Sequence, residues 1–459
     1  MEKWYVAAKK ADFNQIAEEF GISPVMARII RNRDVEGNEA IRKFLYGSYR
    51  DLYSPFLLKD MEKGVEILEN GIREKKKIRV IGDYDVDGIC ATHILCSGLR
   101  EAGAEVDTAI PHRMKDGYGL NEHLIAEAAE AGTQLIITCD NGIAAASQIA
   151  YAKSLGMEVV VTDHHEVPFE ETEEGRREIL PPADAVIDPK QENCKYPFAG
   201  ICGGVVAMKV VQALFARMFP EKETMILDKL LPFAALATVC DVMELLDENR
   251  IVVKEGLKRM RLKPCMGLLA LMQVNGLEPA KLNSYHLGFV IGPCMNATGR
   301  LDTAGRALEL LSSMEQGMAM NLAAELKELN DSRKSMTAKG VEDAHQLIAE
   351  EGLTKDSVLV VYLPDCHESL AGIIAGRLRE IYAKPTFVIT DSEEGVKGSG
   401  RSIDAYHMYE EMVKCKDCFS KFGGHKLAAG LSIDADLFKK NGGIRGLRER
   451  LNAACNLSQ

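Results

Sequence analysis

Between residues 77 and 187 the chain alternates short apolar runs with longer segments whose apolar residues recur at helical spacing. A continuous apolar run predicts a strand buried on both faces, and strands that alternate with helices predict a parallel sheet covered on both sides. The expected strands are residues 78–81, 106–110, 135–138, 159–162 and 185–187, with helices between them such as 89–102 and 122–131. The fold class is therefore α/β with a parallel sheet.

A second, smaller α/β pattern follows a helix-rich stretch. Residues 303–350 are rich in Ala, Leu, Glu, Met and Lys and contain no proline, which predicts long connecting helices. Beyond them, 358–363 and 386–390 are strand-like, 370–382 is helical, and 396–402 and 422–430 are rich in glycine. We expect an N-terminal helical and mixed segment at 1–75, a first α/β domain at 76–302, connecting helices at 303–350 and a smaller α/β domain at 351–459.

The acidic balance of the chain limits the choice of partners. A net charge of −12 argues against a general nucleic-acid binder, which usually carries a basic face. That argument weakens if acidic side chains cluster to hold cations, because bound metal ions reverse the local field. With 46% hydrophobic and 27% charged residues, the composition is that of a folded globular protein and excludes extensive disorder.

Cysteine usage and apolar segments indicate the compartment. Twelve scattered cysteines, several of them inside apolar runs, predict reduced thiols in a cytoplasmic protein rather than a disulfide framework. Cys415 and Cys418 form one C-x-x-C without a second pair at zinc spacing, so we expect two unpaired thiols there. The first ten residues show no signal peptide, and the apolar stretch 201–219 is interrupted by Lys209 and Arg217, so we expect no membrane segment.

Acidic and histidine side chains follow three of the expected strands: Asp83, Asp85 and Asp87 after the first, Asp140 after the third, and Asp163, His164 and His165 after the fourth. Because the carboxyl ends of parallel strands face one crevice, we expect these side chains to meet. Clustered carboxylates stay ionised only if cations neutralise them, and oxygen ligands with one or two imidazoles suit Mn²⁺ or Mg²⁺. Two such ions about 3.5–4 Å apart can activate water and stabilise a phosphoryl transition state.

These segments, DYDVDG at 83–88, DNG at 140–142 and DHH at 163–165, resemble the first three motifs of the DHH phosphoesterases. TVCDV at 238–242 resembles the fourth. The resemblance implies metal ligation by Asp85, Asp87, Asp140, His164 and Asp241, with Asp140 bridging two ions. It also implies that Asp83 is a further ligand or supports one, and that His165 meets phosphate.

Further segments are similar to the RecJ branch of this superfamily. They are PHR (111–113) followed by DGYG (116–119), IDP (187–189), YP (196–197), GGV (203–205), GPCMNATGRL (292–301), and GGH (423–425) with AAG (428–430). The last pair marks the DHH-associated C-terminal domain, so the resemblance identifies 76–302 as the phosphoesterase domain and 351–459 as a nucleic-acid-binding domain.

The RecJ resemblance implies a single-stranded-DNA-specific 5′→3′ exonuclease acting in DNA repair and recombination. The expected partner is single-stranded DNA, and short RNA stays open as a second one. Glycines let backbone N–H groups approach phosphate, and arginine favours bidentate phosphate contacts. The residues expected to bind nucleic acid are Arg113, Asn296, Arg300, Ser399, Arg401, Gly423, Gly424 and His425.

The chain departs from the RecJ pattern in three places. Cys294 stands where the family usually has arginine, and Asp188 where relatives often carry asparagine. No oligonucleotide-binding barrel is recognisable after the C-terminal domain, so we expect a weaker grip on long strands than in longer relatives.

Other functions stay open at this level. An oligoribonuclease or cyclic-dinucleotide phosphodiesterase of the same superfamily would lack the N-terminal segment and the long stretch between His165 and Asp241. A family pyrophosphatase would carry a metal-binding histidine where this chain has Ile81. A non-catalytic nucleic-acid-binding scaffold would have lost several acidic ligands, and here all are present.

Overall fold

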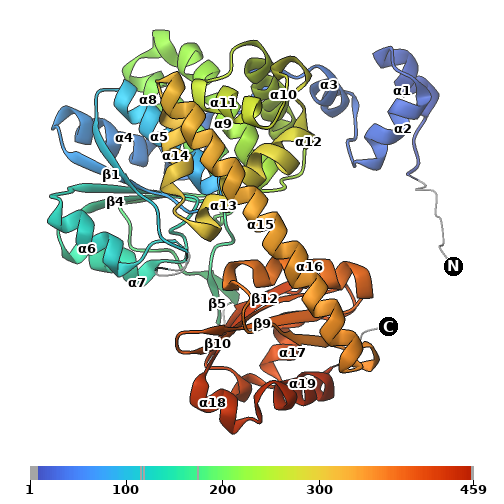
Figure 1. Ribbon diagram of the computed structural model, residues 1–459. Helices are drawn as coiled ribbons and strands as arrows, with labels where there is room; N and C mark the ends of the chain where they lie inside the picture. Colours follow the sequence, from blue (N-terminus) through green and yellow to red (C-terminus); the bar gives the residue numbers. More distant parts are fainter. Residues whose placement is uncertain (1–8, 114–115, 117–118, 173–174, 456–459) are drawn as a thin grey trace. The chain divides into compact units, whose positions relative to one another are not determined.

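The computed structural model of the protein describes residues 9–113, 116, 119–172 and 175–455 (Figure 1). It divides into two compact units, Met1–Lys327 and Glu328–Gln459, and helix α15 (Gln316–Glu350) belongs to both. Residues 1–8, most of the stretch in which we expect no signal peptide, lie outside the described residues, as do Gly117 and Tyr118 of DGYG. Within the described ranges, no helix combines the length and apolar character needed to cross a membrane.

The first unit is built on a five-stranded sheet in the order β2 (Glu105–Ala109), β1 (Lys77–Ile81), β3 (Leu135–Cys139), β4 (Glu158–Thr162) and β7 (Ala185–Ile187). Every neighbouring pair is parallel, so all carboxyl ends lie at one edge. The parallel sheet predicted from the apolar runs is confirmed. Its central strands β1, β3 and β4 are the ones followed by acidic and histidine residues.

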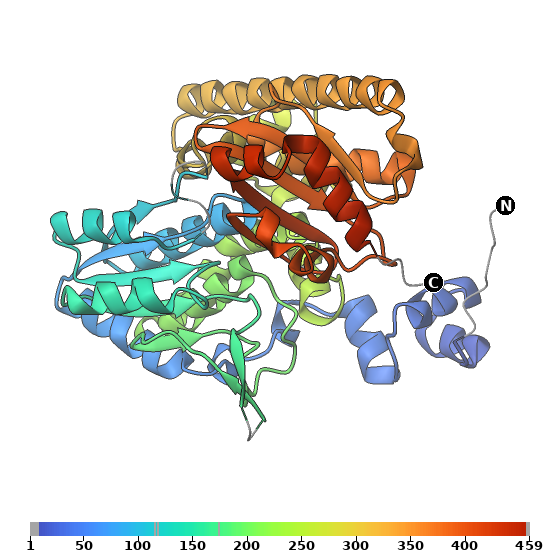
Figure 2. The same cartoon turned by 90° about the horizontal axis from the view of Figure 1, so that it is seen from below.

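Helices cover both faces of this sheet (Figure 2). One face packs against α4 (Met61–Arg73), α5 (Val86–Glu101), α8 (Gly203–Met218) and α9 (Glu223–Cys240). The other packs against α6 (Glu122–Glu130) and α7 (Ala146–Ser154). Alternate residues of one strand serve the two cores, since Ile137 belongs to the first and Ile136 to the second. Burial on both faces explains why these strands read as continuous apolar runs.

The remaining helices of the first unit are α1 (Phe13–Phe20), α2 (Pro24–Asn32), α3 (Asn38–Tyr46), α10 (Asp247–Leu262), α11 (Met266–Val274), α12 (Ser284–His286), α13 (Gly292–Leu301) and α14 (Gly305–Ser312), with a π-helix at Leu287–Ile291. Short 3-10 turns occur at Tyr49–Asp51, Pro55–Leu57, Pro220–Lys222 and Pro279–Lys281. A hairpin of β5 (Phe169–Thr172) and β6 (Gly175–Glu178), which the sequence did not predict, stands apart from the main sheet.

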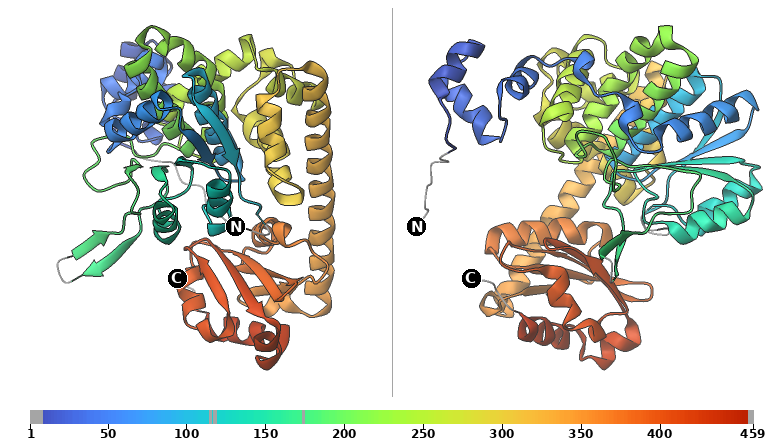
Figure 3. Two further views of the ribbon diagram at one scale, coloured as in Figure 1. Left: turned by 90° about the vertical axis from the view of Figure 1, so that its left-hand side faces the viewer. Right: turned by 180° about the vertical axis from the view of Figure 1, so that it is seen from behind.

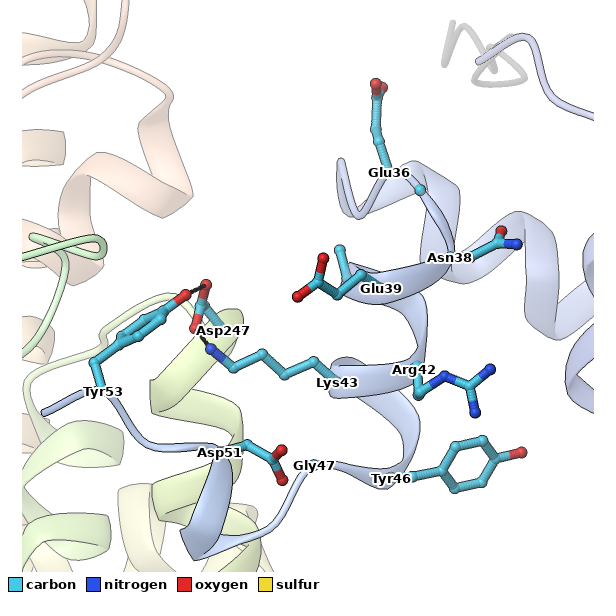
Figure 4. A pocket seen from close by; sticks show the side chains of 12 residues that line it. Glu36, Asn38, Glu39, Arg42, Lys43, Tyr46, Gly47, Asp51, Tyr53 and Asp247 are labelled. Atoms are coloured by element: carbon cyan, nitrogen blue, oxygen red, sulfur yellow. Dashed lines mark hydrogen bonds and ion pairs between the residues drawn. The ribbon is translucent and has the colours of Figure 1, made fainter.

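The N-terminal helices are tied to α10 beside a pocket of about 1100 Å³ (Figure 4). Nζ of Lys43, on α3, donates to Asp247 Oδ1 at 2.5 Å, and the hydroxyl of Tyr53 donates to Asp247 Oδ2 at 2.9 Å. The lysine and the tyrosine thus share one carboxylate at the start of α10. Glu36, Glu39, Arg42 and Asp51 also line this pocket and take no part in that contact.

The second unit carries a mixed sheet in the order β11 (Lys421–Gly424), β12 (Ala428–Asp434), β10 (Gly395–Arg401), β9 (Thr386–Ser392) and β8 (Leu359–Tyr362) (Figure 3). Only β8 and β9 pair in parallel. One face packs against α15 and α16 (Glu368–Tyr382), and the other against α17 (Met408–Val413) and α19 (Gly443–Ala454). Helix α18 (Ala435–Lys440) and turns at Leu353–Lys355 and Lys416–Cys418 complete it.

The two glycine-rich stretches of the second unit fold as strands. The sequence indicated only their composition, because glycine has a low strand propensity. Glycine is required here by packing: a Cβ on Gly400 would lie 2.5 Å from the sulfur of Met408, which packs beneath the sheet. These glycines therefore bring β10 close to the helix that covers its buried face.

Candidate metal centre

The loop after β1 presents three carboxylates through the start of α5. Asp85 is the N-cap of α5, and its Oδ1 accepts from the backbone N–H of Gly88 at 3.0 Å. Asp87 lies in the first turn and accepts from the backbone N–H groups of Gly203 and Gly204 at 2.8 and 2.7 Å. Gly203 and Gly204 are the first two residues of α8, so the N-terminus of this helix stabilises the negative charge of Asp87. A Cβ on Gly203 would lie 2.7 Å from that of Asp140, which explains the glycine pair.

The end of β3 turns Asp140 into the same space. Its backbone is left-handed, with φ of 61°, and its N–H donates to the carbonyl of Thr162 at 3.1 Å. The amide of Asn141 donates to the carbonyl oxygens of Ile81 and Cys139 at 3.2 and 2.9 Å, which ties the end of β3 to that of β1. Local hydrogen bonds thus fix the D-N-G turn that carries the carboxylate of Asp140.

The end of β4 supplies the histidines. Nε2 of His164 lies 3.0 Å from Asp140 Oδ1 and 3.5 Å from Asp87 Oδ2. Nδ1 of His165 lies 2.7 Å from Oδ1 of Asp163, whose Oδ2 accepts from the backbone N–H of Ile143 at 2.9 Å. Asp163 therefore orients His165. The sequence assigned Asp163 no separate role, although its place directly before two histidines at a strand end was a usable signal.

Asp241 reaches this space from the last turn of α9, where it is the C-cap. Its Oδ2 lies 3.8 Å from Nε2 of His164. Three groups offer ligand atoms within 4.8 Å of one another: Asp140, His164 and His165; Asp87, His164 and Asp241; Asp83, Asp85 and Asp140. The structure therefore brings all seven candidate catalytic residues together. Asp140 and His164 each belong to two groups, so the three groups adjoin one another. The two oxygens of the Asp140 carboxylate could serve two ions, whereas the imidazole of His164 could serve one.

The carboxylates repel one another strongly. Burial, followed by the charge of Asp85, raises the pKa of Asp83 to about 7. Burial, followed by the charges of Asp87 and Asp85, raises the pKa of Asp241 to about 7 and that of Asp140 well above its ordinary value. A divalent cation would reverse these shifts by favouring the ionised forms.

The surroundings shift the pKa values of the two histidines in opposite directions. Burial lowers the pKa of His164, which favours the neutral imidazole that binds metal. Both of its ring nitrogens are buried without a hydrogen bond to any described residue, which fits a nitrogen reserved for an ion. Burial also opposes charge on His165, but the hydrogen bond and charge of Asp163 outweigh it and raise the pKa to about 9. The donor set of oxygens and a neutral imidazole fits Mn²⁺ or Mg²⁺.

Two candidate phosphate-binding arginines lie beside Tyr84, in the first carboxylate loop. The guanidinium of Arg113 lies 4.9 Å from the centroid of the Tyr84 ring. Arg300 follows Gly299, where a Cβ would lie 2.7 Å from the carbonyl oxygen of Tyr84. Burial raises the pKa of Tyr84, and the positive charges of Arg113 and Arg300 oppose that rise. Asn296 lies about one turn earlier on α13 and is half-buried.

The candidate residues of the second unit share one side of its sheet. Ser399, Gly430 and Gly423 are aligned across β10, β12 and β11, and the accessible face of β10 also carries Lys397 and Arg401. A Cβ on either glycine of the row would meet no atom within 4 Å. Gly424, with φ of 153°, leads into exposed His425. This side of the sheet therefore leaves backbone open at Gly423 and Gly430, beside Arg401 and beside Lys397, whose Nζ pairs with Glu368 at 3.0 Å.

Arg401 lies over helix α16. A Cβ on Gly372 would lie 2.8 Å from its Nη2, so the absence of a side chain there makes room for the guanidinium. Nη1 donates to the carbonyl of Gly400 at 2.7 Å. Gly372 was not among the residues expected from the sequence, because a glycine inside a helix carries no local signal for a partner on a distant strand.

The two side chains that depart from the RecJ pattern are both buried. Cys294 is fully buried and its sulfur contacts the amide of Asn275. Oδ1 of Asp188 accepts from the backbone N–H of Lys190 at 2.7 Å, and burial raises its pKa to about 7. All twelve cysteines are free thiols. Cys415 and Cys418, the C-x-x-C pair, are both buried.

Comparison with known proteins agrees with the motifs. The family model described as the DHH family, N-terminal domain, matches residues 77–238, and the DHHA1 domain matches 355–454. The chain is 35% identical to the single-stranded-DNA-specific exonuclease RecJ of Bacillus subtilis (strain 168) over 98% of its own length and 55% of the relative's. It is also 35% identical to that of Escherichia coli (strain K12), over 91% of its own length and 73% of the relative's.

Solved structures give the same result. Exonuclease RecJ bound to manganese superposes with a TM-score of 0.73 at 30% identity, covering 88% of this chain and 96% of the other. RecJ of Thermus thermophilus in complex with Mg²⁺ superposes with a TM-score of 0.71 at 25% identity, covering 97% of this chain and 60% of the other. The chain therefore belongs to the RecJ family of DHH phosphoesterases.

Proposed function

We propose that this chain is a metal-dependent exonuclease that hydrolyses single-stranded DNA from its 5′ end, in the cytoplasm, during DNA repair and recombination. The observation that carries the proposal is the overlap of three acid and histidine groups through Asp140 and His164 at the ends of adjacent strands. The names of the RecJ relatives support the choice of single-stranded DNA, and the choice of the 5′ end rests on the motifs that resemble RecJ.

The residues of the first unit have separable roles. Asp85, Asp87, Asp140, His164 and Asp241 would hold two Mn²⁺ or Mg²⁺ ions, with Asp83 as a further ligand or support. When bound, the ions supply the positive charge that activates water and stabilises the phosphoryl transition state. His165, kept protonated by Asp163, can donate from its other ring nitrogen to a phosphate oxygen. Arg113 and Arg300 would hold the neighbouring phosphates beside Tyr84.

The second unit would bind the end of the strand. Its flat row of Ser399, Gly430 and Gly423 leaves backbone groups accessible, and Arg401, Gly424 and His425 border that row. Contacts of this kind address phosphate rather than base edges, so we expect little sequence preference and a steep dependence on salt. The domain limits of 76–302 and 351–459 remain our proposal for how catalysis and strand binding divide.

The alternatives predict different substrates. An oligoribonuclease or cyclic-dinucleotide phosphodiesterase is not favoured, because the RecJ relatives match more than nine-tenths of the chain, including the stretch between His165 and Asp241. A non-catalytic scaffold is not favoured either, because every candidate ligand is present and converges.

The test compares substrates side by side with Mn²⁺: one strand labelled at either end, the same strand as a circle, a duplex, short RNA and a cyclic dinucleotide. We expect rapid loss of the linear single strand from its 5′ end, while the circle and the blunt duplex survive. Rapid loss of the circle, or digestion from the 3′ end, would contradict the assignment of direction. Loss of the cyclic dinucleotide alone would favour the other branch of the superfamily.

A further inference from the structure

A continuous helix from Ser284 to Leu301 exposes one face. It consists of α12, the π-helix and α13. On α13 the residues that stay accessible before its last residue are Pro293, Asn296 and Arg300, at spacings of three and four, whereas those between them are buried. Continued toward the N-terminus at the same spacing, this face reaches Phe289 and Tyr285. The two candidate phosphate-binding residues of α13 therefore share a helix face with two aromatic residues.

The π-helix follows from the local sequence. Pro293 has no N–H and its ring would crowd the carbonyl four residues earlier, so the regular hydrogen-bond ladder is interrupted there. Gly288 and Gly292 let this widened turn pack on the last turn of α9. A Cβ on Gly292 would lie 2.4 Å from the sulfur of Cys240, and that sulfur contacts the carbonyl of Leu287 at 3.6 Å. The widened turn is thereby anchored next to Asp241, a candidate metal ligand.

Tyr285 and Phe289 form a stacked pair on the exposed face. Their ring centroids are 5.0 Å apart with an interplanar angle of 25°. Tyr285 is 62% exposed and Phe289 is 70% exposed. Two large rings held flat against each other in solvent are unusual on a surface, and a π-helix inside a longer helix often marks a functional position.

The charge around this pair suits a polyanion. Residues 279–301 contain no aspartate or glutamate, although the chain has 68 acidic residues in 459. The same segment contains His286 and Arg300, and also Lys281, whose Nζ pairs with Glu278 at 2.9 Å. A strand of phosphates following this helix face would meet Arg300 and the aromatic rings and no carboxylate from the helix itself.

We propose that Tyr285 and Phe289 form a stacking platform for the unpaired bases of the DNA strand whose phosphates Asn296 and Arg300 hold. This inference rests on the proposed function. Along the helix, Phe289 lies about 16 Å from Arg300, so the platform contacts bases some way along the strand from that phosphate. Bases in a duplex are already stacked and paired, so the platform favours a single strand.

The experiment measures stacking without cleavage. In an Asp140→Asn background with Mn²⁺, short single strands carrying 2-aminopurine at each position in turn are titrated with the protein. We expect a change in stacking fluorescence at one or two adjacent positions, and its loss in Tyr285→Ala/Phe289→Ala. The double variant should bind single strands about 5- to 150-fold more weakly for each base it no longer stacks. The single variant Phe289→Tyr should keep both the fluorescence change and the affinity, because tyrosine retains the aromatic face.

The matched control is Leu262→Ala, which removes another apolar side chain that is 77% exposed, on α10. It should leave the fluorescence and the affinity unchanged. Equal binding by the double variant and its parent would overturn the platform. A second outcome would also overturn it: the double variant binds more weakly and melts at a much lower temperature, while Phe289→Leu keeps the parent's affinity and melting temperature as well as Phe289→Tyr does. The pair would then act by packing, because leucine has no aromatic face. If the wild type degrades linear strands normally while no position shows stacking, only this inference fails; if it degrades none, the proposed function fails.

Discussion

Nε2 of His164 lies 3.0 Å from Oδ1 of Asp140, although the two residues follow different strands. They meet because β3 and β4 are adjacent and parallel, and because the left-handed backbone of Asp140 turns its carboxylate toward the neighbouring strand end. Burial lowers the pKa of His164 and raises that of Asp140, so without a cation both groups tend toward their neutral forms. A divalent ion bound between them would favour the neutral imidazole and the ionised carboxylate together.

Removing the shared carboxylate should abolish hydrolysis. We expect Asp140→Asn to lower the rate by at least about 10²- to 10³-fold, the scale of losing one charge-stabilising group. Asparagine is the better choice than alanine for activity measurements, because it tolerates the left-handed backbone at this position. Asp343→Ala, an exposed carboxylate on α15, is the control and should be fully active. Near-normal turnover by a folded Asp140→Asn protein would show that this residue does not bridge.

Removal of metal should stop activity and lower stability together. The carboxylates of the centre repel one another when no cation is present, so Mn²⁺ should raise the melting temperature as any ligand of the native state does. We expect the rise in wild type and a much smaller one in His164→Ala, measured by calorimetry before and after chelation. Full activity in excess chelator would contradict the metal mechanism.

The stabilisation by Mn²⁺ should grow with pH. The pKa values of Asp83 and Asp241 are raised to about 7, chiefly by burial. A group with a raised pKa stabilises the metal-free fold fully below its unfolded pKa and loses that contribution as pH rises through 7. Mn²⁺ requires the ionised carboxylates, so protons compete with it. We expect a small melting-temperature shift at about pH 5.5 and a larger one at about pH 8, with activity falling below about pH 6. A shift independent of pH would contradict this competition.

The sequence was sufficient for the first sheet and for most of the centre. Apolar runs typical of strands buried on both faces, three of them followed by acidic or histidine residues, predict that Asp87, Asp140 and His164 lie at one edge of the sheet. Asp241 could not be placed in this way, because it comes from the end of α9, and only the resemblance to DHH motifs indicated it. Its position depends on the packing of α9 against α5 and α8, which periodicity does not specify.

The second unit was less predictable for a different reason. Strands β10, β11 and β12 contain glycines that allow close packing or leave backbone groups accessible. Because glycine has a low strand propensity, the sequence of these segments does not predict strands. Their pairing brings Ser399, Gly430 and Gly423 into one row although they come from three different strands. The π-helix and the stacking of Tyr285 on Phe289 were not predicted from the sequence either, although Pro293 and the four-residue spacing of the two rings were usable signals.

Because Arg401 lies against Gly372, the role of Arg401 in binding single-stranded DNA can be tested without removing the charge of the arginine. Arg401→Ala should weaken single-strand binding about tenfold or more and reduce the salt dependence by about one phosphate contact, with less effect on turnover at saturation. Gly372→Ala should reproduce the loss, because the added methyl group would lie 2.8 Å from Nη2 and displace the guanidinium. Gly376→Ala is the matched control, one turn later on α16, where a Cβ would lie 3.9 Å from Cγ of Arg401 and fit without movement. Affinity is measured by fluorescence anisotropy over a range of salt concentrations. If Gly372→Ala and Gly376→Ala bind equally well while Arg401→Ala does not, the charge matters but its placement over the helix does not; if all three bind as wild type, Arg401 does not hold the strand.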